Sequence, residues 1–301
     1  MNSNPNQKPR FDFVQSRKAF FMLSGVITIL GVLTLAIFGL NYGVDFKSGT
    51  TLDVAFVEAA DVKKSDLEPI LENHKTTISI GEERVNIRFE KVLEEEQRLR
   101  ILQTFEEQYG EISVEESTVD AGMAKELGVK AISVVLIASL FIIIYVSIRF
   151  EWRFALAAIV ALFHDAFIVI SLFSILRFEV NLTFIAAVLT IIGYSINDTI
   201  VIFDRIRENL RTAKIKSFDD LATLVNTSIW QTLARSINTA LTVIIAALFL
   251  FLFGSPSIQL FSLAMLIGLI SGGYSSIFIA SQIWLLLKKS SIGKKKTVST
   301  S

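Results

Sequence analysis

The sequence has 301 residues, of which 52% are hydrophobic and only 19% are charged, and its formal net charge is zero. Because soluble domains carry about 25% charged residues, this composition indicates a membrane protein and disfavours a soluble enzyme. The absence of cysteine excludes disulfides, thiolate metal sites and a cysteine nucleophile. Two histidines are too few for a typical histidine-built metal centre, so we expect neither a metal site nor a cofactor.

The zero net charge conceals a strong asymmetry along the chain. Residues 41–130 contain 20 acidic and 11 basic side chains, whereas the rest of the chain contains 9 acidic and 18 basic ones. This pattern predicts an acidic polar domain joined to a membrane part with basic loops. An acidic polar domain also disfavours nucleic-acid binding, because its charge has the wrong sign.

Six apolar stretches are long enough to cross a bilayer as helices, which takes roughly 20 residues each. They cover about 19–40, 129–148, 154–176, 182–203, 232–253 and 260–287. The first is too long for a signal-peptide apolar region and precedes no small-residue cleavage pattern, so we interpret it as a retained anchor. The expected domains are a cytoplasmic segment 1–18, a first transmembrane helix 19–40, an extracytoplasmic domain 41–128, transmembrane helices two to six within 129–287, and a basic tail 288–301.

Lysine and arginine in the short loops predict the orientation of these spans. Sixteen of them lie in the N-terminal segment, the loops after spans two and four, and the C-terminal tail. The two short loops on the opposite side contain Arg177 alone. By the positive-inside rule, both termini are expected to be cytoplasmic and residues 41–128 to lie outside the cytoplasm.

The polar domain alternates predicted strands and helices. The expected order is a strand at 50–58, a helix at 61–73, a hairpin of 77–80 and 84–90 around residues 81–83, a helix at 93–110 and a strand at 111–119. This β-α-β-β-α-β order predicts a ferredoxin-like α+β domain, a fold that by itself specifies no function.

Three charged residues fall inside the predicted spans, where each costs at least roughly 2.5–3.5 kcal/mol at a helix centre. They are Asp165, Asp198 and Arg235. Asp198 lies five residues before the expected cytoplasmic edge, about 7–8 Å deep, and Arg235 enters from the same side, so the two can pair. Burial raises the pKa of a carboxyl group and a nearby arginine lowers it. Whether the group holds a proton then depends on geometry and water access, as a proton-driven machine requires. A static pair that fixes helix packing is the alternative.

Other polar and small residues in the spans permit two interpretations. Asn197 can extend a hydrogen-bonded path from Asp198, or it can serve only in packing. His164 and Asp165 form either a structural pair or part of a proton path. Gly268 and Gly272 form a G-x-x-x-G pattern, whose ordinary role is close helix contact. The sequence has no metalloprotease, nucleophile-elbow or Walker-type motif, so we expect no hydrolytic active site.

Several of these segments resemble the SecF family of bacterial protein-export subunits. The resemblance is carried by TFIAAVLTIIGYSINDTIVIFDRIREN at 183–209, and it continues in ARSINTALT, IGLISGGYSSIFIAS, HDAFIV and NYGVDFKSGT. The last of these departs from the family at Ser48, where a glycine usually stands. The matching positions in that segment are Gly43, Asp45, Phe46, Gly49 and Thr50, and Gly193 joins Gly268 and Gly272 as a helix-packing glycine.

The resemblance implies a function that composition and periodicity do not. It implies half of a resistance-nodulation-division transporter, with SecD as the other half, acting with the SecYEG channel and often YajC. Such a complex resides in the bacterial cytoplasmic membrane and uses the proton-motive force to promote translocation of a preprotein. Asp198 and Arg235 match the family's proton-pathway positions. Two alternatives stay open, namely a small-molecule exporter half of the same superfamily and a purely structural assembly factor.

Overall fold

The computed structural model describes residues 11–56, 62–67, 69–71, 74–81 and 84–292. The chain divides into two compact units. One is a helical unit of residues 1–40, 135–178 and 183–301, and the other, of residues 41–134 and 179–182, is called the outer unit here after its predicted location. The described residues contain six helices that are long and apolar enough to cross a membrane, as the six predicted spans require.

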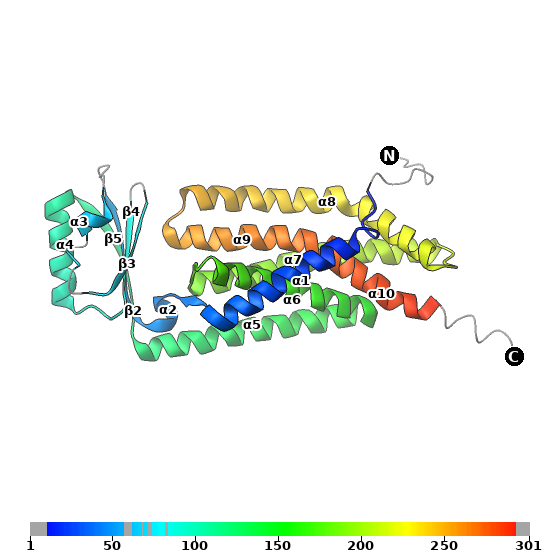
Figure 1. Ribbon diagram of the computed structural model, residues 1–301, viewed down its shortest axis with the longest axis horizontal. Coiled ribbons are helices and arrows are strands. Elements are labelled where there is room, and N and C mark those ends of the chain that lie inside the picture. Colours follow the sequence, from blue (N-terminus) through cyan, green and yellow to red (C-terminus); the bar gives the residue numbers. More distant parts are fainter. Residues whose placement is uncertain (1–10, 57–61, 68, 72–73, 82–83, 293–301) are drawn as a thin grey trace. The chain divides into compact units, whose positions relative to one another are not determined.

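The spanning helices are α1 (Arg17–Phe38), α5 (Ala121–Arg149), α6 (Trp152–Ile175), α7 (Leu182–Thr212), α8 (Phe218–Phe253), and α9 (Pro256–Ser275) continued by a π-helical turn (Ser276–Ala280) into α10 (Ser281–Ile292). Figure 1 shows the long helices of the helical unit running side by side. Helices α5, α7 and α8 extend well beyond the apolar stretches, because backbone hydrogen bonding continues into polar sequence. At the start of α8, for example, Ser217 and Asp220 form a capping box.

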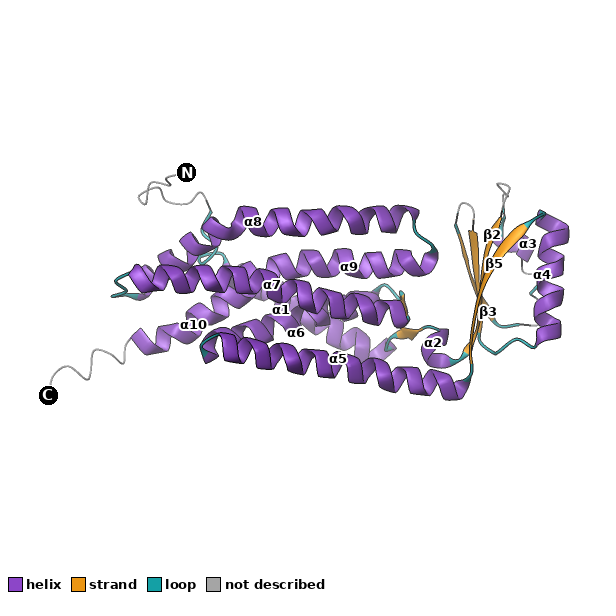
Figure 2. Ribbon diagram, turned by 180° about the vertical axis from the view of Figure 1, so that it is seen from behind, coloured by secondary structure: helices purple, strands orange, loops and turns teal. Residues whose placement is uncertain are grey.

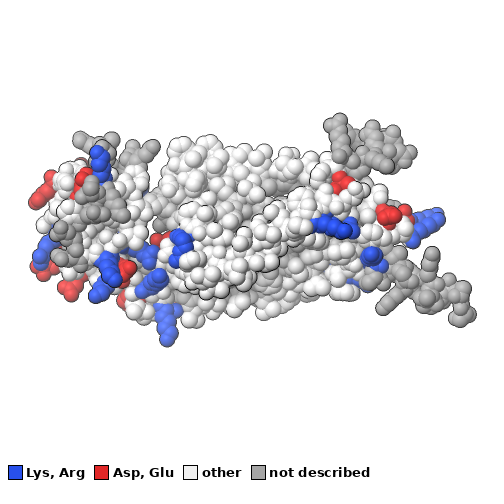
Figure 3. Space-filling view, in the orientation of Figure 1, with Lys and Arg blue, Asp and Glu red and all other residues white. Residues whose placement is uncertain are grey.

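One end of the helical unit collects the basic side chains. Arg149 pairs with Asp204 at 3.4 Å and Lys288 pairs with Glu151 at 3.3 Å, which joins helix ends that are far apart in sequence. An aromatic and aliphatic core lies beneath these pairs, including Phe154, which stacks on the fully buried Trp284. On the face shown in Figure 3, the middle of the helical unit carries no charged side chain.

The outer unit contains a four-stranded antiparallel sheet in the order β3-β4-β2-β5. Its strands are β2 (Gly49–Phe56), β3 (Thr76–Ile80), β4 (Arg84–Phe89) and β5 (Ile112–Val119), and α4 (Glu95–Tyr109) connects β4 to β5. Figure 2 shows α4 covering one face of this sheet. This strand order is the one expected of a ferredoxin-like domain. A two-stranded parallel pair, β1 (Asn41–Tyr42) with β6 (Glu179–Val180), and the short helix α2 (Val44–Lys47) complete the unit.

The first helix of this domain is shorter than predicted. Residues 61–73 are expected to be helical, but α3 spans only Lys64–Leu67. Pro69 explains the early end, since proline disfavours helical backbone in the residues before it. Parts of the predicted first strand, first helix and hairpin turn, at 57–61, 68, 72–73 and 82–83, lie outside the described residues, as do the outermost parts of both predicted terminal segments, 1–10 and 293–301.

Alternation of side chains places the domain core on the α4 side of the sheet. Leu52, Val54 and Ile87 are fully buried there, together with Phe105 of α4. The intervening β2 residues, including Asp53, point to the other face, because successive strand residues alternate. Helix α4 begins with a capping box in which Glu94 and Gln97 each bond the other's backbone, and it ends at a glycine with φ +81°.

Candidate intramembrane site

Asp198 lies on the buried side of α7, at the place where α7, α8 and α9 meet. Asp198 is 5% exposed, and it shares the buried face of α7 with Ser195, one helical turn earlier. Among the described residues, no hydrogen bond or ion pair involves its carboxylate. Asp198 lines a cavity of about 10 Å³ with residues of α8 and α9, a space that accommodates about one water molecule.

Two glycines of α9, Gly268 and Gly272, line this cavity. A Cβ atom on Gly268 would lie 2.3 Å from the Ile191 side chain, and one on Gly272 would lie 3.2 Å from Cβ of Ser195. Both glycines therefore bring α9 close to α7, as the G-x-x-x-G pattern indicates. Gly193 differs, because it is exposed and a Cβ there would have no atom within 4 Å. Its expected packing role has no partner within the described residues.

Arg235 lies in a separate cleft from the cavity at Asp198. The cleft has a volume of about 430 Å³ and is also lined by Asn197, Asp204 and Gln231. Arg235 is exposed, and no ion pair within 4.0 Å joins it to Asp198 in the described chain. The predicted direct pair is thus not formed.

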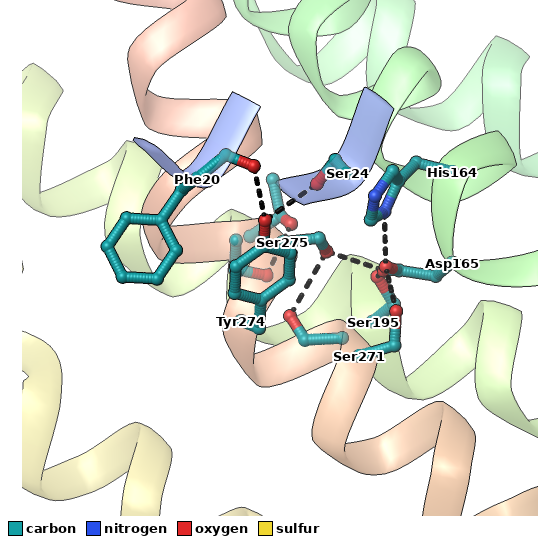
Figure 4. A network of polar contacts seen from close by, with 11 residues as sticks. Phe20, Ser24, His164, Asp165, Ser195, Ser271, Tyr274 and Ser275 are labelled. Atoms are coloured by element: carbon teal, nitrogen blue, oxygen red, sulfur yellow. Dashed lines mark hydrogen bonds and ion pairs between the residues drawn. The ribbon is translucent and has the colours of Figure 1, made fainter. Parts of the chain in front are cut away.

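Asp165, by contrast, is surrounded by hydrogen-bonding groups. Ser195 of α7 donates to its Oδ2 at 2.5 Å, and Ser275 of α9 donates to the same oxygen at 2.6 Å. Ser271 of α9 donates to Oδ1 at 2.8 Å, and Nδ1 of His164 lies 3.1 Å from that oxygen. Figure 4 shows these side chains converging on Asp165. This fully buried carboxylate therefore ties α6 to both α7 and α9.

His164 also lines a second cavity. This apolar cavity has a volume of about 310 Å³ and lies between α1, α6 and α9. Nε2 of His164 is buried without a hydrogen-bond partner in the described part of the chain. Tyr274 also lines this cavity, and its hydroxyl contacts Ser24 at 2.6 Å and donates to the carbonyl of Phe20 at 2.8 Å. The sequence-predicted pair of His164 and Asp165 is therefore part of a larger network.

The three serines around Asp165 were missed by sequence reasoning. Ser271 and Ser275 are one helical turn apart and flank Gly272, so the small-residue pattern of α9 also contained hydroxyl groups aimed at one face. Ser195 lies three residues before Asp198, on the same side of α7. A search for hydroxyls at helical spacing from a buried charge could have identified them.

In segment 41–50, a close backbone approach requires glycine at residue 49. A Cβ on Gly49, where φ is +136°, would lie 2.3 Å from the Phe89 carbonyl oxygen, whereas one on Gly43 would meet only the end of the flexible Glu179 side chain. Ser48 also has a positive φ of 69°. This conformation explains why the family usually has glycine at that position.

The other matched positions of this segment have local structural roles. Asp45 accepts a hydrogen bond from the backbone N–H of Leu182 at 2.8 Å and so caps the start of α7. Thr50 accepts one from the backbone N–H of Leu93 at 3.1 Å. Phe46 lies in α2, beside Asp45. These hydrogen bonds join the segment 41–50 to other parts of the outer unit.

Family models match most of the chain. The model described as "Protein export membrane protein SecD/SecF, C-terminal" matches residues 100–290, and the "SecD/SecF GG Motif" matches residues 34–60. The chain belongs to the SecD/SecF family. The resemblance to SecF is thereby confirmed, and the glycine segment 41–50 falls within the second match.

Relatives and solved structures extend this result. The chain is 45% identical to the "Protein translocase subunit SecF" of Alicyclobacillus acidocaldarius, over 95% of this chain and 96% of that protein. It is 47% identical to the "Protein translocase subunit SecDF" of Bacillus subtilis, over 93% of this chain but 38% of that protein. A crystal structure of SecDF from Thermus thermophilus, titled a translocon-associated membrane protein, matches with a TM-score of 0.83 at 33% identity, over 93% of this chain and 39% of that one. The chain is thus a membrane protein with the fold of the SecF part of SecDF.

Proposed function

We propose that this chain acts with a SecD subunit in the protein-export machinery and uses the proton-motive force to promote translocation of preproteins. The observation that carries the proposal is an exposed polar face beside the buried Asp198. On that face Asn197, Gln231, Arg235 and Asn238 are all exposed, although they belong to helices that are apolar enough to span a bilayer.

The cost of exposing this face to lipid supports a second membrane subunit. A charged arginine within the hydrocarbon region costs at least roughly 2.5–3.5 kcal/mol, and such residues almost always face protein or water. A partner helix over the cleft of Arg235 would remove that cost. The Bacillus subtilis relative supports SecD as the partner, since its name joins the two subunits and this chain spans 38% of its length.

The proposed mechanism rests on a change in the charge of Asp198. A proton from the outer side neutralises its carboxylate and weakens the electrostatic attraction to Arg235, and release of the proton to the cytoplasm restores it. Coupling requires the two helix arrangements to differ in proton affinity. One charge crossing 100 mV supplies about 2.3 kcal/mol, which shifts a conformational equilibrium about 50-fold.

The rest of the assignment follows from this role. The chain would reside in the bacterial cytoplasmic membrane with both termini cytoplasmic, in line with the basic side chains gathered at one end of the helical unit. It would contact the SecYEG channel, YajC and the translocating preprotein. It would act as a proton-coupled accessory subunit without a hydrolytic active site.

The test compares Asp198→Asn with Asp204→Asn in export-competent membrane vesicles. Both residues lie on α7, but Asp204 is a partly exposed side chain paired with arginines at the helical end. We expect Asp198→Asn to abolish the proton-dependent part of export at normal protein abundance, whereas Asp204→Asn retains it. Full export by Asp198→Asn would refute the proton role.

Two further measurements address the alternative functions. Affinity purification from native membranes should recover SecD, and recovery of an efflux partner in its place would favour a small-molecule exporter. Arg235→Ala should reduce export without reducing the abundance of the complex. A parallel loss of abundance would favour a structural assembly factor.

A further inference from the structure

Ser195 lies between the two intramembrane carboxylates and touches the surroundings of both. Its hydroxyl donates to Oδ2 of Asp165 at 2.5 Å, and Ser195 and Asp198 both line the water-sized cavity. Both carboxylates are buried. A single water in the cavity would complete a hydrogen-bonded line from Asp198 to Asp165, with the serine hydroxyl as its central member.

Two observations show that Ser195 differs from the other hydroxyls around Asp165. Ser275 donates to the same carboxylate oxygen at 2.6 Å and is fully buried, but it does not line the cavity of Asp198. Ser271 donates to the other oxygen and borders the apolar cavity on the far side. Only Ser195, among the described hydroxyls bonded to Asp165, also lines the cavity at Asp198.

We propose that Ser195 conducts protons between Asp198 and Asp165, so that Asp165 is a second proton-carrying group of this machinery. The inference rests on the proposed proton role of Asp198 and extends it to a carboxylate on another helix. His164 orients Asp165 from the opposite side, since its Nδ1 lies 3.1 Å from Oδ1.

The transfer needs no group beyond those described and one water. Asp198 gives its proton to the water in the cavity as that water passes a proton to Oγ of Ser195. The hydroxyl proton of Ser195 moves along its existing hydrogen bond to Oδ2 of Asp165. Asp198 ends ionised, Asp165 ends neutral, and the serine and water are regenerated. One proton has moved from α7 to α6.

Ser275→Ala is the matched control for Ser195→Ala. Each variant deletes one buried hydroxyl and one hydrogen bond to the same oxygen of Asp165. If the hydroxyls only hold helices together, the two variants should behave alike. If Ser195 conducts protons, its loss interrupts the line to Asp198, whereas the loss of Ser275 leaves that line intact.

The experiment measures proton flux into proteoliposomes that contain this chain together with the SecD subunit proposed above, using a pH-sensitive dye under an imposed potential. We expect Ser195→Ala to reduce the flux at least about tenfold relative to Ser275→Ala, as loss of a proton-transferring group typically does. Equal flux in the two variants, at equal amounts of reconstituted complex, would overturn the inference.

Asp165→Asn provides an independent test should Ser195→Ala fail to accumulate. Asparagine has nearly the same shape but cannot carry the proton, so the relay predicts a loss of flux as large as that in Asp198→Asn. Parental flux in Asp165→Asn would refute the relay while leaving the role of Asp198 intact. Parental flux in Asp198→Asn would instead refute the proposed function itself.

Discussion

Asp165 and Asp198 are buried carboxylates of the same helical unit, yet their surroundings are opposite. Asp165 accepts hydrogen bonds from three serines on two other helices, whereas Asp198 has no hydrogen-bond partner among the described residues. A buried polar group is costly mainly when its partners are missing. The contrast teaches that equal burial does not mean an equal role. The hydrogen bonds of Asp165 join three helices, whereas Asp198 makes no such connection.

Removing each carboxylate in turn should give the largest difference in stability between the two sites. Asp165→Ala would leave three buried serine hydroxyls without their acceptor, so we expect a loss of about 3 kcal/mol or more in the free energy of unfolding. Asp198→Ala should cost less than about 1 kcal/mol, because no bonded partner is abandoned. The measurement is the thermal denaturation of the purified complex, with Asp204→Ala as a control at a partly exposed carboxylate. Equal losses at Asp165 and Asp198 would contradict the comparison.

Glycine variants of α7 and α9 test how much close helix contact near Asp198 contributes to stability. We expect Gly268→Val to destabilise the helical unit by about 1–3 kcal/mol, because the added side chain would overlap Ile191. Gly193→Val, on the exposed side of α7, should leave the stability of the isolated chain nearly unchanged. Thermal denaturation of the isolated chain tests both variants. A loss in Gly193→Val matching that in Gly268→Val would show that reduced backbone freedom, not helix contact, is responsible.

Sequence reasoning identified the charges of this site but not their partners. Charges within apolar stretches are rare, so Asp165, Asp198 and Arg235 were apparent without a structure. Serine carries no such signal, because in a helix its hydroxyl can bond a carbonyl of its own preceding turn, as Ser133 does with Val129. The direct pairing of Asp198 with Arg235 was predicted from depth alone. Depth does not fix the direction in which each helix presents its side chains.

The fold shows the same division between strong and weak signals. The six spans and the order of strands followed from hydrophobic periodicity, which the burial of alternate residues in β4 bears out. The ends of α5, α7 and α8 did not, because helices continue through polar residues once they have been nucleated. The predicted length of α3 was too great, because Pro69 disfavours helical backbone in the residues before it.

Asp53 of the outer unit extends the comparison to a third buried carboxyl. It is 9% exposed, its Oδ1 has no hydrogen-bond partner within the described chain, and it lies directly opposite Glu115 of β5. Burial raises the pKa of this carboxyl, while Arg84 partly opposes the shift and Glu115 adds to it. If missing partners are what make a buried carboxylate costly, Asp53→Asn should stabilise the outer unit by up to about 1 kcal/mol at neutral pH.

The pH dependence of the stabilisation by Asp53→Asn tests whether the charge of the carboxylate is its cause. Because the folded-state pKa of Asp53 lies above its unfolded value, protonation favours the folded state, and this contribution is lost as the pH rises through the folded pKa. The advantage of Asp53→Asn should therefore shrink as the pH is lowered from 7 toward 4. Amide hydrogen exchange in β2 and β4 of the full chain, corrected for intrinsic rates, measures it. A constant advantage would attribute the gain to something other than the charge.

Ser48→Gly supplies an uncharged reference for that experiment and the smallest expected effect. Ser48 has φ 69° and ψ 158°, a region that costs a residue other than glycine about 1–3 kcal/mol. Glycine relieves this strain but loses more freedom on folding, so we expect a net gain of about 0.5 kcal/mol in the outer unit. Hydrogen exchange in β2 should slow by the same factor at every pH, since no titrating group is altered. If the gain from Ser48→Gly varied with pH as that from Asp53→Asn does, the shared cause would be a pH-dependent change in the whole sheet, and the unpartnered carboxyl could not be the source.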